Sequence, residues 1–214
     1  MCGRYTLHLS PSLLAGELNL PIPDEYSPDY NITPGSEILS RTADSLVCMQ
    51  WGVRTPQNFH VNARLETADT TPRFRDAWLE HRCIVPANGF YEWLNDGVRK
   101  QPYYIYPKNK QLLYLAGLWF PRSGDSPLPQ CVLLTAAASA NVKEIHSRMP
   151  VALPRDHLNG WLDLSLSKED ALACAQSRDY EKHTVSSRVN NAQNKDSSLV
   201  TPTSPALDDQ MQLF

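Results

Sequence analysis

The sequence lacks a long apolar run, a secretory leader and closely spaced cysteines. No stretch approaches the roughly 18 consecutive apolar residues of a membrane-spanning helix, and the N-terminus lacks the basic-then-apolar layout of a secretory signal. The five cysteines are odd in number, scattered and without a C-x-x-C pair, which argues against a disulfide framework and a structural zinc site. These absences predict a soluble intracellular protein with reduced thiols, cytoplasmic and, if bacterial, associated with the nucleoid.

An overall positive charge and internal repeats are also absent. The formal net charge is -3, so nothing global attracts nucleic acid, and any DNA binding must come from a local basic groove. With 214 residues, 42% of them hydrophobic, the chain is long enough to bury one sizeable core, which favours a single domain.

The pattern of short elements predicts an α+β fold. The 17 prolines are spread along the chain between short apolar runs, and regular α/β alternation is absent. Helices are expected after Ser10-Pro11, after Thr71-Pro72 as far as about His81, and after Ser167, which forms a capping-box pattern with Asp170. Asn95-Asp96-Gly97 reads as a hairpin turn. Strands are expected at 3–7, 46–51, 83–86, 90–94, 103–106, 112–119 and 131–135.

The C-terminal segment changes in composition. From about Asn190 it is rich in Asn, Gln, Ser, Thr, Pro and Asp, with little apolar content to support a core. We therefore predict a domain over residues 1–196 and a solvated, flexible tail over 197–214. The tail ends in Gln210-Met211-Gln212-Leu213-Phe214, which places two apolar residues at the end of a polar leash.

Cys2 is the most informative single residue. Methionine before a small residue is commonly removed, and its removal here would leave a free 1,2-aminothiol. The amine has a reference pKa of about 7.7–8.0 and the thiol one of about 8.5, so both have a usable nucleophilic fraction near neutral pH. The amine would form an imine with an aldehyde, and the thiol would then close a five-membered thiazolidine. The alternative is an ordinary small residue near a terminus.

Two segments supply polar side chains for such chemistry. Asn62 and Arg64 alternate, so on an extended segment both point to one face, where an amide and a guanidinium can hold a phosphate or a sugar oxygen. Glu92 lies among aromatic residues in a strand-like run, an apolar environment that disfavours the charged carboxylate and suits general acid/base catalysis. A strand glutamate that points to solvent is the alternative.

Two further segments add a proton carrier and surfaces for DNA. His146 is a natural proton shuttle near neutral pH, and Arg148, two residues on, can bind a phosphate from the same side. Pro34 and Trp51 fall on expected loops, where they can stack against unpaired bases. A turn at Pro34 and a core position for Trp51 are the alternatives.

Taken together in order, these segments resemble the SOS response-associated peptidase (SRAP) family, from residue 1 to about residue 195. The family implies a single α+β domain around a barrel-like, mainly antiparallel sheet with peripheral helices, with neither metal nor other cofactor. It implies self-processing that exposes Cys2 and a thiazolidine crosslink with the aldehyde of an abasic site in single-stranded DNA, formed by a monomer away from membranes. An AP-lyase activity, in which β-elimination cleaves the strand, is a second outcome of the same imine. The resemblance rests on Met1 to Arg4, Asn31 to Gly35, Trp51-Gly52, Asn62 to Thr67, Arg82-Cys83, Gly89 to Trp93, Thr135, His146 to Pro150, Val185-Ser186 and Val189-Asn190.

The resemblance also implies a role for each matching residue. Cys2 matches the nucleophile, Asn62 the amide that positions the amine and the sugar, Glu92 the acid/base in imine formation, and His146 the histidine that helps to open the deoxyribose ring. The matching DNA contacts are Arg4, Arg64 and Arg148 to phosphates, Thr135 beside the site, and Pro34 and Trp51 where the strand bends and bases stack.

The last five residues resemble the peptide by which bacterial polymerases and repair proteins bind the sliding clamp. Gln210 comes first and Leu213 and Phe214 last, whereas Met211 and Gln212 depart from the commonest middle residues. Leu213 and Phe214 would fill an apolar pocket while the linker supplies reach. A terminus with incidental apolar residues is the alternative.

Two other functions fit parts of the pattern. A cysteine peptidase acting on other proteins would use Cys2 as nucleophile and His146 as base, and would turn over a peptide substrate. A non-covalent reader of modified or single-stranded DNA would need Arg64, Arg148 and Trp51 but not Cys2. A covalent species formed with an abasic oligonucleotide and absent for Cys2→Ala separates both from the crosslinking function.

Overall fold

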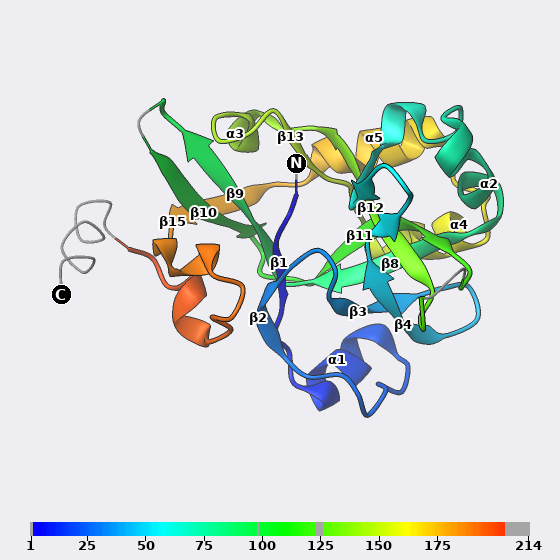
Figure 1. Cartoon of the computed structure of the whole chain (residues 1–214), viewed down its shortest axis with the longest axis horizontal. Helices are drawn as coiled ribbons and strands as arrows, with labels where there is room; N and C mark the ends of the chain where they lie inside the picture. The colour runs from blue at the N-terminus through cyan, green and yellow to red at the C-terminus, as the bar shows by residue number, and fades with distance from the viewer. Residues whose placement is uncertain (1, 98, 123–125, 204–214) are drawn as a thin grey trace.

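The computed structural model describes residues 2–97, 99–122 and 126–203. Short strands dominate, and the helices are brief and peripheral (Figure 1). In chain order the elements are β1 (Tyr5–Leu7), α1 (Pro11–Leu18), β2 (Asp29–Ile32), β3 (Glu37–Arg41), β4 (Leu46–Trp51), β5 (Val53–Arg54), β6 (Phe59–His60), β7 (Asn62–Arg64), η1 (Leu65–Thr67), α2 (Pro72–Glu80), β8 (Arg82–Ala87), β9 (Gly89–Asn95), β10 (Lys100–Pro107), β11 (Leu113–Phe120), β12 (Gln130–Ala137), α3 (Ala140–Lys143), β13 (Arg148–Pro150), β14 (Ala152–Leu153), η2 (Arg155–His157), α4 (Leu158–Leu162), α5 (Lys168–Ser177), β15 (Tyr180–Thr184), η3 (Ser187–Asn190) and η4 (Ser197–Val200).

A closed ring of five strands forms the core. Strand β12 pairs with β4, followed by β3, β8 and β11, and β11 pairs again with β12. Only β12 breaks the antiparallel pattern among the described strands, because it runs parallel to β4 and to β7. The central strands β8, β11 and β12 are almost entirely buried, as continuous apolar runs predict. The expected α+β fold with a barrel-like, mainly antiparallel sheet is confirmed.

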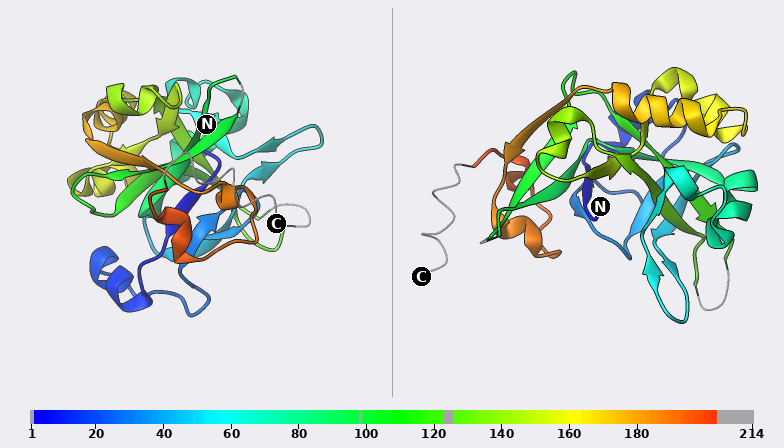
Figure 2. Two further views of the ribbon diagram at one scale, coloured as in Figure 1. Left: turned by 90° about the vertical axis from the view of Figure 1, so that its left-hand side faces the viewer. Right: turned by 90° about the horizontal axis from the view of Figure 1, so that it is seen from above.

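A second, five-stranded sheet positions the N-terminus. Its order is β15-β10-β9-β1-β2, so β1 lies inside the sheet, with Tyr5 opposite Phe90 of β9 and Ile32 of β2. The first described residues thus enter between this sheet and the barrel (Figures 1 and 2). The residue expected to be the nucleophile is held by pairing on both sides of the strand that follows it.

Local turn and capping signals set several boundaries as predicted. The Ser10 hydroxyl accepts a hydrogen bond from the N–H of Leu13 at the start of α1, and the Ser167 hydroxyl accepts one from Asp170 at the start of α5. The β9–β10 hairpin turns at 95–97, where Gly97 has φ +89°, a conformation that glycine adopts without strain. The helix expected from residue 72 to 81 is α2.

The C-terminal segment departs from the sequence prediction. Residues 191–203 pack against the second sheet and are not a solvated tail, because Leu199 of η4 is fully buried in a small cluster with Tyr91 and Tyr104. The amide Nδ2 of Asn31, itself 0% exposed, donates to the carbonyls of Val189, Asn191 and Asn194 at 3.2, 3.1 and 2.9 Å. We call residues 186–203 the strap. The expected tail start at residue 197 is therefore wrong as far as Thr203, and residues 204–214 lie outside the described part.

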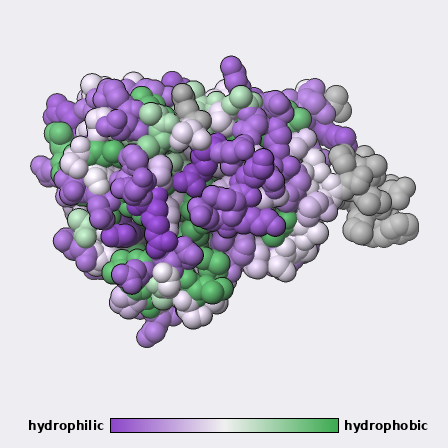
Figure 3. All heavy atoms as spheres, turned by 180° about the vertical axis from the view of Figure 1, so that it is seen from behind, coloured by the Kyte–Doolittle hydropathy of each residue, from purple (hydrophilic) through white to green (hydrophobic). Residues whose placement is uncertain are grey.

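The surface is mostly polar. Seen from behind, hydrophilic residues cover most of the molecule and apolar residues form small separate patches (Figure 3). The exposed large hydrophobic side chains of the described residues are Leu13, Leu79 and Leu164. Among the helices of that part of the chain, none has both the length and the apolar character needed to cross a bilayer.

Candidate active site

Cys2 is anchored through its backbone by Asn62. The side chain of Cys2 is 0% exposed, and its carbonyl accepts a 2.8 Å hydrogen bond from Nδ2 of Asn62 at the start of β7. The second amide atom of Asn62, Oδ1, is buried and accepts no hydrogen bond from the described residues. Since a buried acceptor without a partner is costly, this atom is suited to receive a donor from a bound group. The amide therefore holds the Cys2 backbone with one atom and presents a buried acceptor with the other.

Burial changes the acidity of the Cys2 thiol. Removal from water raises its pKa well above the usual value, and the negative charge of Glu92 raises it further. Its Sγ lies 3.7 Å from the carbonyl oxygen of Arg4, to which it donates. The sequence predicted a pKa of about 8.5 with a usable thiolate fraction. In the folded protein the thiol is instead protonated at neutral pH.

Glu92 and His146, the two residues predicted to act as acid and base, lie next to each other. Glu92 on β9 is 3% exposed, so the alternative of a solvent-facing strand glutamate is wrong. Its Oε1 lies 3.9 Å from Nδ1 of His146, whose side chain is 31% exposed. Nδ1 also lies 3.0 Å from both the N–H and the carbonyl oxygen of Arg148. A neutral ring accepts from that N–H and a protonated one donates to that carbonyl, so His146 has a partner in both protonation states.

Arg148 is held by Glu66, a residue that the sequence analysis did not single out. The guanidinium Nη1 and Nη2 donate to the two carboxylate oxygens of Glu66 at 3.0 and 2.8 Å. Burial is the largest influence and raises the pKa of Glu66, but the hydrogen bonds and charge of Arg148, a backbone hydrogen bond and the charge of Arg64 together leave the pKa below its usual value. Glu66 lies in η1, directly after β7, so the alternation that relates Asn62 and Arg64 on an extended strand does not extend to it, and no pattern in the sequence indicated its role.

Thr135 accepts hydrogen bonds from Arg148 and is buried. Its side chain is 0% exposed, and its hydroxyl donates to the carbonyl of Ala63 at 3.3 Å and accepts from Nε of Arg148 at 3.3 Å. Its carbonyl accepts from Nη2 of Arg148 at 2.5 Å. The predicted contact of Thr135 with DNA does not fit this conformation, because the side chain is buried and its hydroxyl is bonded to the Ala63 carbonyl and to Arg148.

The other two arginines differ in availability. Arg64 is exposed and, within the described chain, makes neither an ion pair nor a side-chain hydrogen bond. Arg4 is committed to the strap: Nη1 donates to Oδ1 of Asn31 and the carbonyl of Val189 at 2.8 and 2.5 Å, and Nη2 donates to the carbonyl of Asn190 at 2.9 Å. Arg64 is therefore placed for a phosphate, whereas Arg4 joins the two ends of the domain.

The whole chain can be compared with known proteins. Residues 1–192 match the family described as SOS response associated peptidase (SRAP). The chain belongs to the SRAP family. This SRAP chain is 34% identical to the abasic site processing protein YoaM of Bacillus subtilis, over 94% of this chain and 97% of that protein. It is 29% identical to the abasic site processing protein YedK of Escherichia coli, over 94% and 100%. A crystal structure of a Bacteroides thetaiotaomicron protein has the same fold, with a TM-score of 0.82 at 22% identity over 95% and 100%.

In this SRAP chain the two residues predicted to stack against bases, Trp51 and Pro34, differ in exposure. Trp51 is 0% exposed, packs edge-on against Tyr5 at 5.3 Å and donates from Nε1 to the carbonyl of Val61 at 2.9 Å. The prediction that bases stack on Trp51 is wrong, because closure of the barrel places the ring in the core. Pro34 is half-buried in the turn between β2 and β3, and its contact with the DNA strand stays a prediction.

The described residues of this SRAP chain hold no candidate metal site. Within the residues that the structure describes, no group of three or more His, Cys, Asp or Glu side chains is arranged to hold a metal ion. The residues predicted to bind a sliding clamp, Gln210, Leu213 and Phe214, lie outside the described part of the chain.

Proposed function

We propose that this protein captures abasic sites in single-stranded DNA by forming a covalent thiazolidine through Cys2. The observation that carries the proposal is the convergence on one residue: the Cys2 carbonyl is bound by Asn62, and Glu92, 3% exposed, lies close enough to the Cys2 thiol to raise its pKa. His146 follows 3.9 Å beyond Glu92. Relatives over almost the whole chain carry the name abasic site processing protein, which supports the same function.

Self-processing comes first. Hydrolysis of the Met1–Cys2 peptide bond consumes one water, releases methionine and frees the α-amine of Cys2. Glu92 is the group beside Cys2 that can accept a proton from the attacking nucleophile and return it to the leaving amine. We thus assign the autopeptidase activity to Cys2 and Glu92, which also take part in the later crosslink.

The raised pKa of the Cys2 thiol supports an order of crosslinking steps in which the amine reacts first. At neutral pH the thiol is protonated, so the amine attacks the aldehyde carbon first and loss of water gives an imine. The thiol then adds across the C=N bond, the sulfur bonding to carbon and its proton passing to nitrogen through Glu92 or His146. One water leaves overall. The buried Oδ1 of Asn62 accepts from the amine or from a sugar hydroxyl during these steps.

DNA is held locally rather than by the overall charge. The exposed Arg64 on β7 adjoins Asn62 and so places a phosphate next to the reacting sugar. β-Elimination from the imine, with Glu92 or His146 as base, would give AP-lyase activity before the thiol closes the ring. We propose that the protein acts as a monomer.

Intact mass spectrometry tests the crosslink. Wild-type protein should lack Met1 and should gain the mass of an abasic oligonucleotide less one water. Cys2→Ala should form no such species, whereas Cys48→Ala, which removes a half-exposed thiol elsewhere, should react as wild type does. A chain that keeps Met1, or equal yields from Cys2→Ala and wild type, would show the proposal to be wrong. Repeated cleavage of peptides without adduct formation would instead identify a peptidase.

We propose in addition that Gln210 to Phe214 bind the replication clamp. A clamp contact would concentrate the protein where single strands arise. Retention on an immobilised bacterial sliding clamp should be lost in Leu213→Ala/Phe214→Ala, and equal retention of both proteins would reject this partner.

A further inference from the structure

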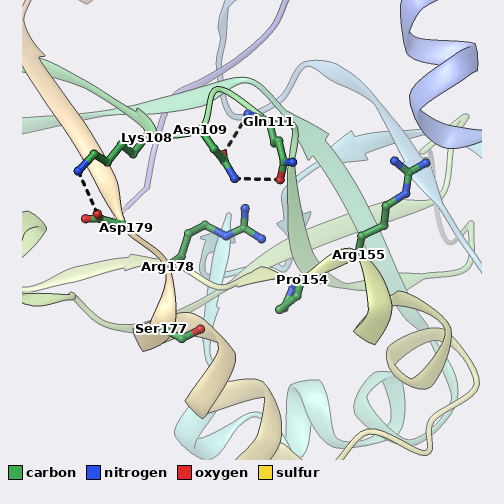
Figure 4. A pocket seen from close by; sticks show the side chains of 8 residues that line it. All are labelled: Lys108, Asn109, Gln111, Pro154, Arg155, Ser177, Arg178 and Asp179. Atoms are coloured by element: carbon green, nitrogen blue, oxygen red, sulfur yellow. Dashed lines mark hydrogen bonds and ion pairs between the residues drawn. The ribbon is translucent and has the colours of Figure 1, made fainter.

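A pocket of about 490 Å³ lies outside the candidate active site, where β10, β14 and α5 end (Figure 4). Lys108 and Gln111 line it from the turn after β10, Arg155 from η2, and Arg178 and Asp179 from the residues after α5. The Lys108 side chain extends outward to Asp179, and that of Arg155 extends toward Glu17. The side chain of Arg178 lies between the other two basic residues (Figure 4). The pocket thus gathers side chains from three segments that are distant in sequence.

The pocket concentrates positive charge on a chain of net negative charge. Its lining holds three basic residues and one acidic residue, whereas the whole chain has a formal net charge of -3. Arg178 donates from Nη2 to the carbonyl of Leu153 at 3.1 Å and has no carboxylate within ion-pair distance in the described residues. Four of its five N–H donors therefore have no protein acceptor recorded in that part of the chain.

The two flanking cations are only weakly neutralised. Lys108 lies 3.6 Å from Asp179, and Arg155 lies 3.5 Å from Glu17, with side chains between 46% and 70% exposed. Such exposed pairs contribute little and exchange readily for another anion. Gln111 accepts through Oε1 from Asn109 at 2.9 Å, which leaves its amino group as a neutral donor. The donors in the pocket suit an oxyanion, and a guanidinium fits phosphate in a bidentate manner.

We propose that this pocket binds a phosphate group of the DNA strand that flanks the lesion, an inference that rests on the proposed function. Strand β10 connects the two sites: Tyr103 lies opposite Glu92, and Lys108 follows five residues later, about 17 Å further along. Duplex DNA advances about 3.4 Å per nucleotide of each strand and a single strand can extend further, so this distance corresponds to at most about five nucleotides. A short oligonucleotide centred on the lesion would not reach the pocket, whereas a long one would.

The test measures how the binding of single strands depends on their length and on the charge of Arg178. Binding of 5-mer and 21-mer single strands, each with a central tetrahydrofuran analogue that cannot form the crosslink, is measured between 50 and 200 mM salt. For Arg178→Gln we expect about two- to tenfold weaker binding of the 21-mer and a salt slope lower by about 0.7, with no change for the 5-mer. Its crosslinking rate at saturating abasic 21-mer should equal that of wild type. Arg75→Gln, which removes an exposed arginine on α2, is the matched control.

The outcomes separate this inference from the proposed function. If Arg178→Gln and Arg75→Gln give the same 21-mer affinity and salt slope, the pocket does not contact the strand and the inference is wrong, whether or not wild type crosslinks. Titration with inorganic phosphate at constant ionic strength provides a second arm. Saturable binding that Arg178→Gln abolishes, with unchanged 21-mer binding, would assign the pocket to a free anion and overturn the DNA contact. Absence of any crosslink in wild type, with the length-dependent difference intact, would reject the proposed function alone.

Discussion

The Glu66–Arg148 ion pair offers the sharpest test of the candidate site. Glu66→Gln keeps the shape of the side chain but removes its charge and one of the two acceptors for the guanidinium. Arg148 is 16% exposed and Glu66 is 37% exposed, so the pair lies between the exposed and buried cases. Exposed pairs are worth about 0–1 kcal/mol and breaking a buried one costs about 3–5 kcal/mol. After allowance for solvent screening of Glu66, we expect a loss of about 1–2 kcal/mol.

This loss should affect reaction and binding in opposite directions. Because the backbone N–H of Arg148 orients His146, a less ordered Arg148 should slow crosslinking at saturating abasic DNA by about 5- to 30-fold. Binding of an intact single strand should tighten, with a salt slope steeper by about 0.7, since Arg148 is freed for a phosphate. The melting temperature should fall by about 2–8 °C.

Single-turnover crosslinking, salt-dependent binding and thermal melting measure the three quantities. Asp76→Asn removes an equal charge from the exposed Arg75–Asp76 pair on α2 and should leave the crosslinking rate unchanged. A crosslinking rate within twofold of wild type in Glu66→Gln, despite a lower melting temperature, would refute the role of Glu66 in ordering the site.

Three further predictions concern burial. Burial raises the pKa of the Cys2 thiol, so the stability that the protonated thiol contributes is fully present below the unfolded pKa of about 8.5 and is lost as pH rises above it. Between pH 8.5 and 10 the free energy of unfolding of wild type should fall by up to about 2 kcal/mol more than that of Cys2→Ser. An equal fall in both proteins, measured by denaturant unfolding, would contradict this. Asn31→Ala removes the amide that donates to three strap carbonyls, of which those of Val189 and Asn191 keep a second donor, and should cost about 1–3 kcal/mol, with first proteolytic cleavage in the strap; cleavage elsewhere at an unchanged rate would show that Asn31 does not hold it. Trp51→Phe should lower stability by about 1–3 kcal/mol through the lost Val61 hydrogen bond, while DNA affinity per folded molecule stays constant; weaker affinity at unchanged stability would restore the stacking role.

The sequence was sufficient for features that depend on local pattern. Continuous apolar runs predicted β8, β11 and β12, and capping residues such as Ser10 and Ser167 predicted helix starts. Two- and three-residue strands such as β5, β6, β13 and β14 are too short to produce a period and were not predicted. They form because neighbouring segments of the closed barrel supply their partners.

The site was predictable in its composition but not in its exposure. Asn62 and Glu92 lie beside Cys2 and His146 lies beside Glu92, whereas Trp51, which was expected on a loop, and Thr135 are buried, because both belong to strands of the closed barrel. The strap was missed for a different reason. Its composition is polar, and it is held mainly through backbone carbonyls that accept from Asn31 and Arg4, an interaction that leaves no hydrophobic pattern in the sequence.

The pairing of Arg4 with residues 189 and 190 has a consequence for synthesis of the chain. The strand β1 that follows Cys2 is made well before the strap, because the Val189 carbonyl that binds Arg4 lies 185 residues further along the chain. Until the strap is made, the N-terminal segment can pair with β2 and β9, but Arg4 lacks its carbonyl acceptors. The surroundings of the predicted nucleophile are therefore complete only after residues 189 and 190 have been synthesised.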